Sequence, residues 1–275
     1  LEEDAHTYLC RGIARSALGD NRGSIDDFTY SISLNSNLAE AYMERGIARY
    51  NLEDKRGAID DFNQALHINP NLALAYYGRG VTHGDMGYHQ KAIDDFNQAL
   101  HLNSAFFDAY TRRGLARYDL GDKQGAIDDF NQLIRINSHF ADGYAARGFV
   151  YCDLGNYQEA INDFNQAIII NPNYAQAYHN RGIARSNLGD KQGAIDDYTR
   201  ALNLNPNYAS AYYNRGMIRS DLGCEKAAMD DYTQAIRIDT NYAQAYNNRG
   251  AIRTYLGNYQ GAIDDYIQAL RVDSS

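Results

Sequence analysis

The sequence is poor in the residues that would define a disulfide-bonded, metal-binding or membrane-spanning protein. It contains only three cysteines, Cys10, Cys152 and Cys224, far apart in a chain of 275 residues. This spacing argues against a disulfide framework and against a zinc site. No apolar run approaches the roughly 20 residues that a membrane span requires. We therefore expect no metal site, no cofactor and no direct insertion into a membrane.

Positive charge and catalytic signatures are also scarce. The chain has 26 Lys and Arg residues against 35 Asp and Glu residues, a formal net charge of −9. This deficit disfavours nucleic-acid binding, which depends on basic side chains that neutralise phosphates. A glycine-rich phosphate loop, a His-Glu-x-x-His motif and a nucleophile elbow are missing from the sequence. We therefore expect no enzymatic activity.

The few prolines reveal how the chain is organised. Pro70, Pro172 and Pro206 occupy the same place in a 34-residue segment that recurs eight times without insertion or deletion. When each copy is numbered from position 1 to position 34, all three fall at position 32. Such a period predicts a stack of similar structural units. We expect a single array over residues 1–275, with copies at 5–38, 39–72, 73–106, 107–140, 141–174, 175–208, 209–242 and 243–275.

The copy at 175–208 indicates what one unit forms. Its first fourteen positions carry apolar residues near the three-and-four spacing of an amphipathic helix. A Gly-Asp pair then interrupts the pattern, since glycine commonly ends a helix and aspartate can cap the next one. A second amphipathic run ends at Asn205, because a residue before proline avoids helical angles. The two helices form an antiparallel hairpin that places Gly182 opposite Tyr198, and each hairpin must stack on its neighbours.

These positions resemble the tetratricopeptide repeat (TPR). The matching features are an aromatic residue at position 4, Gly at 8, Ala at 20, an aromatic residue at 24, Ala at 27 and Pro at 32. Position 4 is Tyr in all eight copies: Tyr8, Tyr42, Tyr76, Tyr110, Tyr144, Tyr178, Tyr212 and Tyr246. The resemblance implies an all-α fold, a right-handed α-solenoid of stacked helix hairpins whose first helices line a concave groove. The Arg-Gly and Asp-aromatic pairs look bacterial in style, and similar arrays are plentiful in cyanobacteria.

Two charged positions repeat without exception. Position 7 is Arg and position 23 is Asp in every copy, for example Arg181 and Asp197. Both lie at the same level of the predicted hairpin, so we expect a ladder of Arg–Asp pairs that braces the two helices. The alternative is a row of arginines presented to an acidic partner. Position 11 is Arg in six copies, and we expect it to form further pairs between helices or between copies.

The resemblance also places a ligand site. In the TPR family the concave groove is lined mainly by positions 2, 5, 6, 9, 12 and 13. The asparagines at position 6 of the last three copies resemble the asparagine ladder that holds a peptide backbone in the repeats of O-linked N-acetylglucosamine transferase. An amide can both donate and accept a hydrogen bond. The alternative is three solvated asparagines inherited by recent duplication. The expected peptide-binding residues are Asn180, Asn214, Asn248, Asn247, His179, Tyr213, Met217, Phe149, Tyr118, Tyr77 and Tyr50.

The function expected from these features is a scaffold for protein–protein interaction. It would bind a protein or peptide ligand, with apolar anchors and some basic charge, in the concave groove. One alternative is a self-assembling module, a homo-oligomer formed by end-to-end stacking. Its basis is the apolar face that the last copy presents through Ile263, Tyr266, Ile267 and Leu270. The other is the regulatory array of a longer enzyme. We expect a cytoplasmic location and, because the chain begins at Leu1, a fragment or a processed form whose start would hide any signal peptide.

Overall fold

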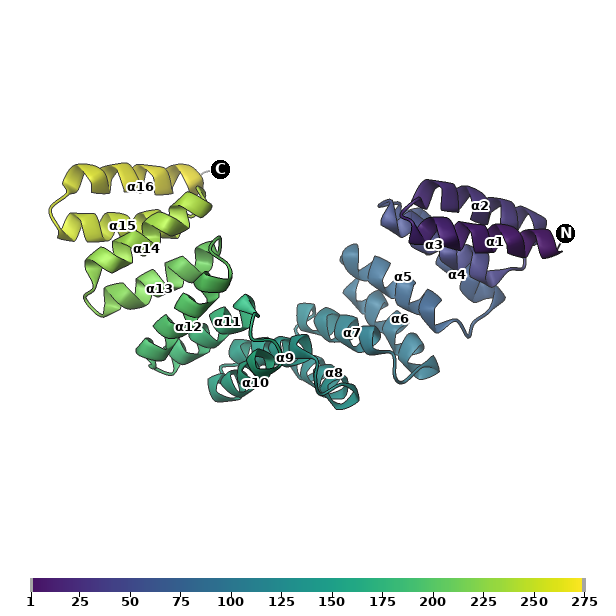
Figure 1. Cartoon of the computed structure of the whole chain (residues 1–275), viewed down its shortest axis with the longest axis horizontal. Coiled ribbons are helices and arrows are strands. Elements are labelled where there is room, and N and C mark those ends of the chain that lie inside the picture. Colours follow the sequence, from purple (N-terminus) through teal and green to yellow (C-terminus); the bar gives the residue numbers. More distant parts are fainter. Residues whose placement is uncertain (1, 274–275) are drawn as a thin grey trace. The chain divides into compact units, whose positions relative to one another are not determined.

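The computed structural model describes residues 2–273, with side chains from residue 4 to residue 272. This part of the chain is all-α and consists of helices that pair in sequence as antiparallel hairpins (Figure 1). The helices are α1 (Glu2–Ala17), α2 (Asn21–Leu34), α3 (Ala39–Asn51), α4 (Lys55–Ile68), α5 (Ala73–Asp85), α6 (His89–Leu102), α7 (Phe107–Asp119), α8 (Lys123–Ile136), α9 (Ala141–Asp153), α10 (Tyr157–Ile170), α11 (Ala175–Asn187), α12 (Lys191–Leu204), α13 (Ala209–Asp221), α14 (Glu225–Ile238), α15 (Ala243–Tyr255) and α16 (Tyr259–Asp273). The first helix of a copy packs against the second helix of the same copy, and within each half of the chain, α1 to α8 and α9 to α16, the second helix packs against the next hairpin.

The helices fall into two compact units. The first unit, Leu1–Ser138, holds α1 to α8, and the second, His139–Ser275, holds α9 to α16. Each unit therefore contains four hairpins and has its own buried clusters. The two units are described separately below.

The turn inside each hairpin is made by residues at positions 15 and 16. The glycines at position 15 have φ between 73° and 85°, the left-handed region that glycine enters without strain. Asp190 follows at position 16, and its carboxylate accepts the backbone N–H of Gly193 at 2.9 Å, which caps α12. A Cβ on Gly193 would lie 2.1 Å from that carboxylate. The repeated Gly-Asp-x-x-Gly pattern is therefore one capping device.

The connection between hairpins depends on asparagine more than on proline. Asn205 follows α12, and its side chain accepts the backbone N–H of Asn207 at 3.1 Å. The same turn follows α2, where Asn35 accepts from Asn37 at 3.0 Å although that copy has Ser36 at the proline position. Such a side chain turns the backbone away from the helix on its own. Asn103 makes the same turn after α6, and Asp239 makes it after α14, so these copies end their second helix without proline.

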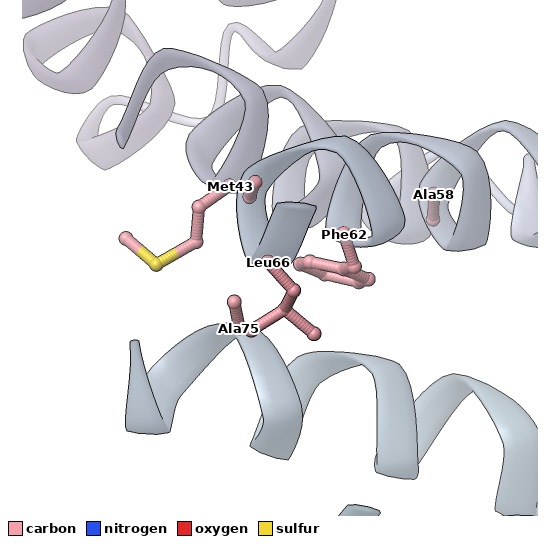
Figure 2. Close-up of a cluster of buried hydrophobic side chains, with 6 residues drawn as sticks. Met43, Ala58, Phe62, Leu66 and Ala75 are labelled. Carbon is pink, nitrogen blue, oxygen red and sulfur yellow. The ribbon is translucent and has the colours of Figure 1, made fainter. Parts of the chain in front are cut away.

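The core of a hairpin is a glycine packed against an aromatic ring. A Cβ placed on Gly182 would lie 2.7 Å from Cε1 of Tyr198, so only glycine allows this approach. The predicted opposition of Gly182 and Tyr198 is confirmed. Apolar contacts then join one hairpin to the next, and Figure 2 shows Leu66 of α4 pointing toward Ala75 of α5.

The predicted ladder of Arg–Asp pairs is present in all eight copies. Arg181 donates from Nε and Nη2 to the buried carboxylate of Asp197 at 2.9 and 2.6 Å. The closest Nη2–Oδ1 distances are between 2.5 and 2.7 Å in every copy: Arg11–Asp27, Arg45–Asp61, Arg79–Asp95, Arg113–Asp129, Arg147–Asp163, Arg181–Asp197, Arg215–Asp231 and Arg249–Asp265. This two-pronged geometry matches the planar guanidinium to the carboxylate.

The same arginine also joins neighbouring hairpins. Nη1 of Arg181 donates to Asn165 of the preceding copy at 2.6 Å, and Arg215 donates to Thr199 at 2.9 Å. The guanidinium of Arg181 lies over the ring of Tyr178, 5.4 Å from its centroid. One side chain thus binds its own hairpin and the hairpin before it, which gives the repeated arginine a role in the scaffold.

Candidate functional site

The groove positions named by the sequence border a series of surface pockets. Three pockets are lined by equivalent residues, namely positions 9, 12, 13 and 17 of one copy and positions 6, 9 and 13 of the next. In the second unit, one pocket of about 360 Å³ lies at α13, α14 and α15, and another of about 230 Å³ lies at α9, α10 and α11. The predicted residues Met217 and Asn248 line the first of these, and Phe149 and Asn180 line the second.

At position 5 of the sixth and seventh copies, the side chain packs against an aromatic ring in the loop that leads to the next copy. His179 is only 7% exposed, and its ring stacks on Tyr208 with centroids 4.6 Å apart. Tyr213 stacks in the same way on Tyr242 at 4.9 Å. In both cases the ring fills the gap between its own copy and the loop that leads to the next. These side chains therefore help to fix the loop that joins one copy to the next.

His179 is the centre of a hydrogen-bond network of two predicted asparagines. Its Nδ1 donates to Oδ1 of Asn180 at 3.2 Å, and its Nε2 accepts from Nδ2 of Asn214 at 3.1 Å. The network therefore holds the imidazole neutral, with its proton on Nδ1. Burial lowers the pKa of His179 below its usual value, and the contact with Asn180 opposes this only in part. The neutral ring keeps an acceptor turned toward Asn214.

The next copy repeats this arrangement with tyrosine in place of histidine. Nδ2 of Asn248 donates to the hydroxyl of Tyr213 at 3.3 Å. Burial raises the pKa of the neighbouring Tyr232 to about 12, against a smaller opposing effect of Asn248. Both Asn214 and Asn248 thus use their amide nitrogen to bind position 5 of the preceding copy. Among the contacts of the described residues, the Oδ1 atoms of these two amides have no donor.

Not every predicted site residue joins this group. Asn247 is exposed beside Asn248 on α15. Tyr50, Tyr77 and Tyr118 belong to the first unit, where Tyr50 and Tyr77 line a pocket of about 320 Å³ and Tyr118 is half-buried. Contact of any of these residues with a peptide stays a prediction.

The groove of the first unit has different chemistry. The hydroxyl of Tyr50 donates to Asp85 at 2.5 Å, and this bond, more than burial, raises the pKa of Tyr50 to about 12. Position 6 is Gly78 in the third copy, where a Cβ would lie 2.6 Å from the ring of Phe62, and it is the exposed Arg112 in the fourth. An asparagine at Gly78 would collide with that ring. The row of asparagines therefore does not extend into these copies.

The described helices offer neither a metal site nor a membrane span. No group of three or more His, Cys, Asp and Glu side chains in residues 2–273 is arranged to hold a metal ion. None of the helices within that range has the length and apolarity needed to cross a membrane.

Sequence models of the repeat cover most of the chain. The model described as "TPR repeat" matches residues 148–189. Models described as "Tetratricopeptide repeat" match residues 39–72, 77–139, 175–208, 209–242 and 243–275. The chain is a tetratricopeptide repeat protein. The matched ranges begin at residue 39. The first hairpin nevertheless has the features of the later TPR copies at the equivalent positions, namely the ion pair Arg11–Asp27 and the close approach of Gly12 to the ring of Phe28.

Solved structures agree with this TPR fold. A crystal structure of MamA protein is 28% identical, with a TM-score of 0.58, and covers 62% of this chain and 94% of its own. YrrB, described as a TPR protein with an unusual peptide-binding site, is 21% identical, with a TM-score of 0.59 over 67% of this chain and 95% of its own. The C-terminal part of a TPR repeat-containing protein from Cytophaga hutchinsonii is 16% identical, with a TM-score of 0.73 over 87% of this chain and 98% of its own. The last two show the fold alone. The comparison with curated proteins gives no match.

Sequence reasoning missed one polar feature of this TPR groove. Glu225 begins α14 at position 17 and lines the pocket of Met217 and Asn248. Its Oε2 atom is buried and has no hydrogen-bond partner. The signal was present in the sequence, since position 17 is Lys in the second, fourth and sixth copies and Glu only in the seventh.

Proposed function

We propose that this TPR protein is a non-catalytic scaffold that docks an extended segment of a partner protein along the groove of its second unit. The TPR fold is typically such a scaffold. One observation carries the proposal for this chain. Asn214 and Asn248, one copy apart, are held in the same way by position 5 of the preceding copy.

This arrangement suits recognition of a main chain. Because the amide nitrogens are already bound, the two Oδ1 atoms are left as acceptors for backbone N–H groups. Side chains held before binding lose less conformational entropy when a ligand arrives. At position 9, the exposed Phe149 and Met217 and the half-buried Ile183 supply apolar surface for alternate side chains of the segment. Main-chain contacts would give affinity, and these apolar contacts would give specificity.

The test is selection from a library of short random peptides capped at both ends. Wild type is compared with Asn214→Ala plus Asn248→Ala. The matched control is Asn173→Ala plus Asn207→Ala, because these exposed asparagines lie in loops of the same unit. We expect wild type and control to enrich the same peptides and the groove variant to lose them, with circular dichroism showing that all three are helical. Equal enrichment by all three proteins would contradict the role of the asparagines.

A second experiment tests the main-chain contact itself. Each backbone nitrogen of an enriched peptide is methylated in turn, which removes one N–H donor at a time. If Asn214 accepts from one of these groups, methylation there weakens binding to wild type by about fivefold or more and has less effect on Asn214→Ala. Losses that are the same in both proteins would show that the amide grips no backbone donor.

A second candidate function is self-association through α16. Its apolar residues Ile263, Tyr266, Ile267 and Leu270 are 51%, 37%, 41% and 67% exposed. An apolar face of this kind marks a contact surface for another molecule. A mass that rises with protein concentration in sedimentation equilibrium, and that Ile263→Lys returns to that of a monomer, would favour it. A strict monomer at all concentrations would exclude self-association by this face.

A further inference from the structure

The pocket at α13, α14 and α15 is an acidic cavity inside the proposed groove. It has a volume of about 360 Å³, and none of its lining residues is basic. Asp221 and Glu225 contribute carboxylates, while Met217 and Ala251 contribute apolar surface. Asp221 already has a cation, because Lys191 of the preceding copy lies 3.2 Å from its Oδ2. The charge that lacks a partner is therefore the charge of Glu225.

Two equivalent places elsewhere in the chain pair position 17 of one copy with an aspartate at position 13 of the next. These pairs are Lys191–Asp221 at 3.2 Å and His89–Asp119 at 3.6 Å. Other junctions carry neutral residues at both positions, as in Asn21 with Asn51 and Tyr157 with Asn187. At the junction of the seventh and eighth copies these two positions are Glu225 and Tyr255. Glu225 therefore places an anion at the position where Lys191 places a cation, and Tyr255 at position 13 is not an ionic partner for it.

The helix that carries Glu225 explains the negative charge of its carboxylate but does not supply a hydrogen-bond partner for it. The carboxylate lies in the first turn of α14, where the helix dipole favours negative charge. That preference accounts for the sign of the charge, but it leaves Oε2 buried without a hydrogen bond. A buried acceptor without a donor destabilises the protein unless something from outside supplies the donor. An external cation with N–H groups would remove this cost.

We propose that the pocket at α13, α14 and α15 binds a lysine or arginine side chain of the docked segment, a role that rests on the proposed peptide-binding function. The ammonium or guanidinium group pairs with the carboxylate of Glu225, whose half-buried side chain turns Oε2 toward the pocket when the cation enters. The methylene stem lies on Met217 and Ala251, as long basic side chains do on apolar surface. The ring of Tyr255, which is 78% exposed, offers its face to the same cation. Asn248 lines the same pocket, so the basic residue follows directly from the main-chain contact.

The experiment uses the full chain and capped peptides with one fixed position in a random background. The fixed residue is lysine, arginine, norleucine or glutamate, and norleucine keeps the stem of lysine without its charge. We expect wild type to bind the lysine and arginine pools at least about tenfold more tightly than the norleucine pool. Glu225→Gln loses this preference but still binds peptides. The matched control Glu159→Gln removes an exposed carboxylate from the first turn of α10 and keeps the preference.

Two further variants separate the effect of charge in the pocket from a loss of folding. Tyr255→Lys alters an exposed side chain and places a cation beside Glu225, so it fills the pocket from within and abolishes the preference for basic peptides. Glu225→Lys should reverse the preference toward the glutamate pool. Enrichment by wild type without any preference for lysine or arginine overturns this inference and leaves the groove intact. Failure of wild type to enrich any pool overturns the proposed function as well.

Discussion

The buried aspartate at position 23 is bound by two cations in most copies. Asp197 is bound by Arg181 at 2.6 Å and by Arg185 at 2.9 Å. Asp163 is bound by Arg147 at 2.6 Å, but position 11 of that copy is Tyr151, so the described contacts include no second cation. Burial raises the pKa of Asp163 even though Arg147 opposes it, whereas the bond from Arg11 lowers the pKa of Asp27. Asp163 therefore has one cation fewer than Asp197 to offset its burial.

Removing the position 7 arginine should therefore cost more in the fifth copy than in the sixth. We expect Arg147→Leu to lower the free energy of unfolding by about 3–5 kcal/mol, because it leaves a buried carboxylate unpaired. Arg181→Leu should lower it by about 1–3 kcal/mol, because Asp197 keeps Arg185. Urea unfolding near neutral pH measures both.

The double variants complete the cycle for each pair. Asp163→Leu added to Arg147→Leu should recover part of the lost stability, since it removes the orphaned charge. Strictly additive losses, or equal losses for the two single arginine variants, would contradict this account.

A second prediction at the residue scale concerns pH. The pKa of His179 is below its ordinary value of 6.5 in the folded protein, first because the ring is buried. As the pH falls below about 6.5, His179 therefore becomes protonated in the unfolded chain while it stays neutral in the folded chain. The stability that neutral His179 contributes is present above pH 6.5 and is lost as the pH falls through the folded pKa.

His179→Tyr removes this dependence with little change in packing. The seventh copy shows that tyrosine fits, because Tyr213 stacks on Tyr242 and binds Asn248 as His179 stacks on Tyr208 and binds Asn214. We expect wild type to lose stability relative to His179→Tyr between pH 6.5 and pH 5, as measured by urea unfolding at each pH. Parallel profiles for the two proteins would show that His179 does not titrate in this way.

At the scale of the element, the hairpin turn has one exception. Glu53 adopts φ 64° where seven other copies have glycine. A left-handed conformation costs a residue with a Cβ free energy that glycine does not lose. We expect Glu53→Gly to stabilise the protein by about 0.5–1 kcal/mol, with Glu53→Ala as the control that keeps the strain. Thermal unfolding of the three proteins tests this, and a lower midpoint for Glu53→Gly would contradict it.

Helix pairing was predictable from sequence because each signal for it is local. The turn glycine, the capping aspartate and the spacing of small and large residues act within one hairpin, as at Gly182 and Tyr198. The side-chain turn at Asn205 was visible only in part, because proline next to it offered a sufficient explanation. In a copy without proline, Asn35 makes the same side-chain turn after α2.

At the scale of the whole molecule, the chain consists of two units with separate cores. The first has clusters such as that around Phe62, and the second has clusters such as that around Phe164. We expect residues 1–138 and 139–275 to be helical and to unfold cooperatively when each is expressed alone. Circular dichroism with urea unfolding tests this. A fragment without helical signal would show that its unit depends on the rest of the chain.

The sequence by itself determined the period, the hairpins, the Arg–Asp pairs and the TPR family, since each depends on residues at fixed spacing within one repeat. It also named the asparagines of the groove. Only the tertiary structure decided that His179 and Tyr213 bind the amide nitrogens of Asn214 and Asn248. Likewise, only the tertiary structure shows that Oε2 of Glu225 is buried without a partner. The physical reason is that burial and hydrogen bonding between copies join residues 30 or 35 positions apart, as in Lys191–Asp221 and His179–Asn214, and the pattern within one copy does not specify them.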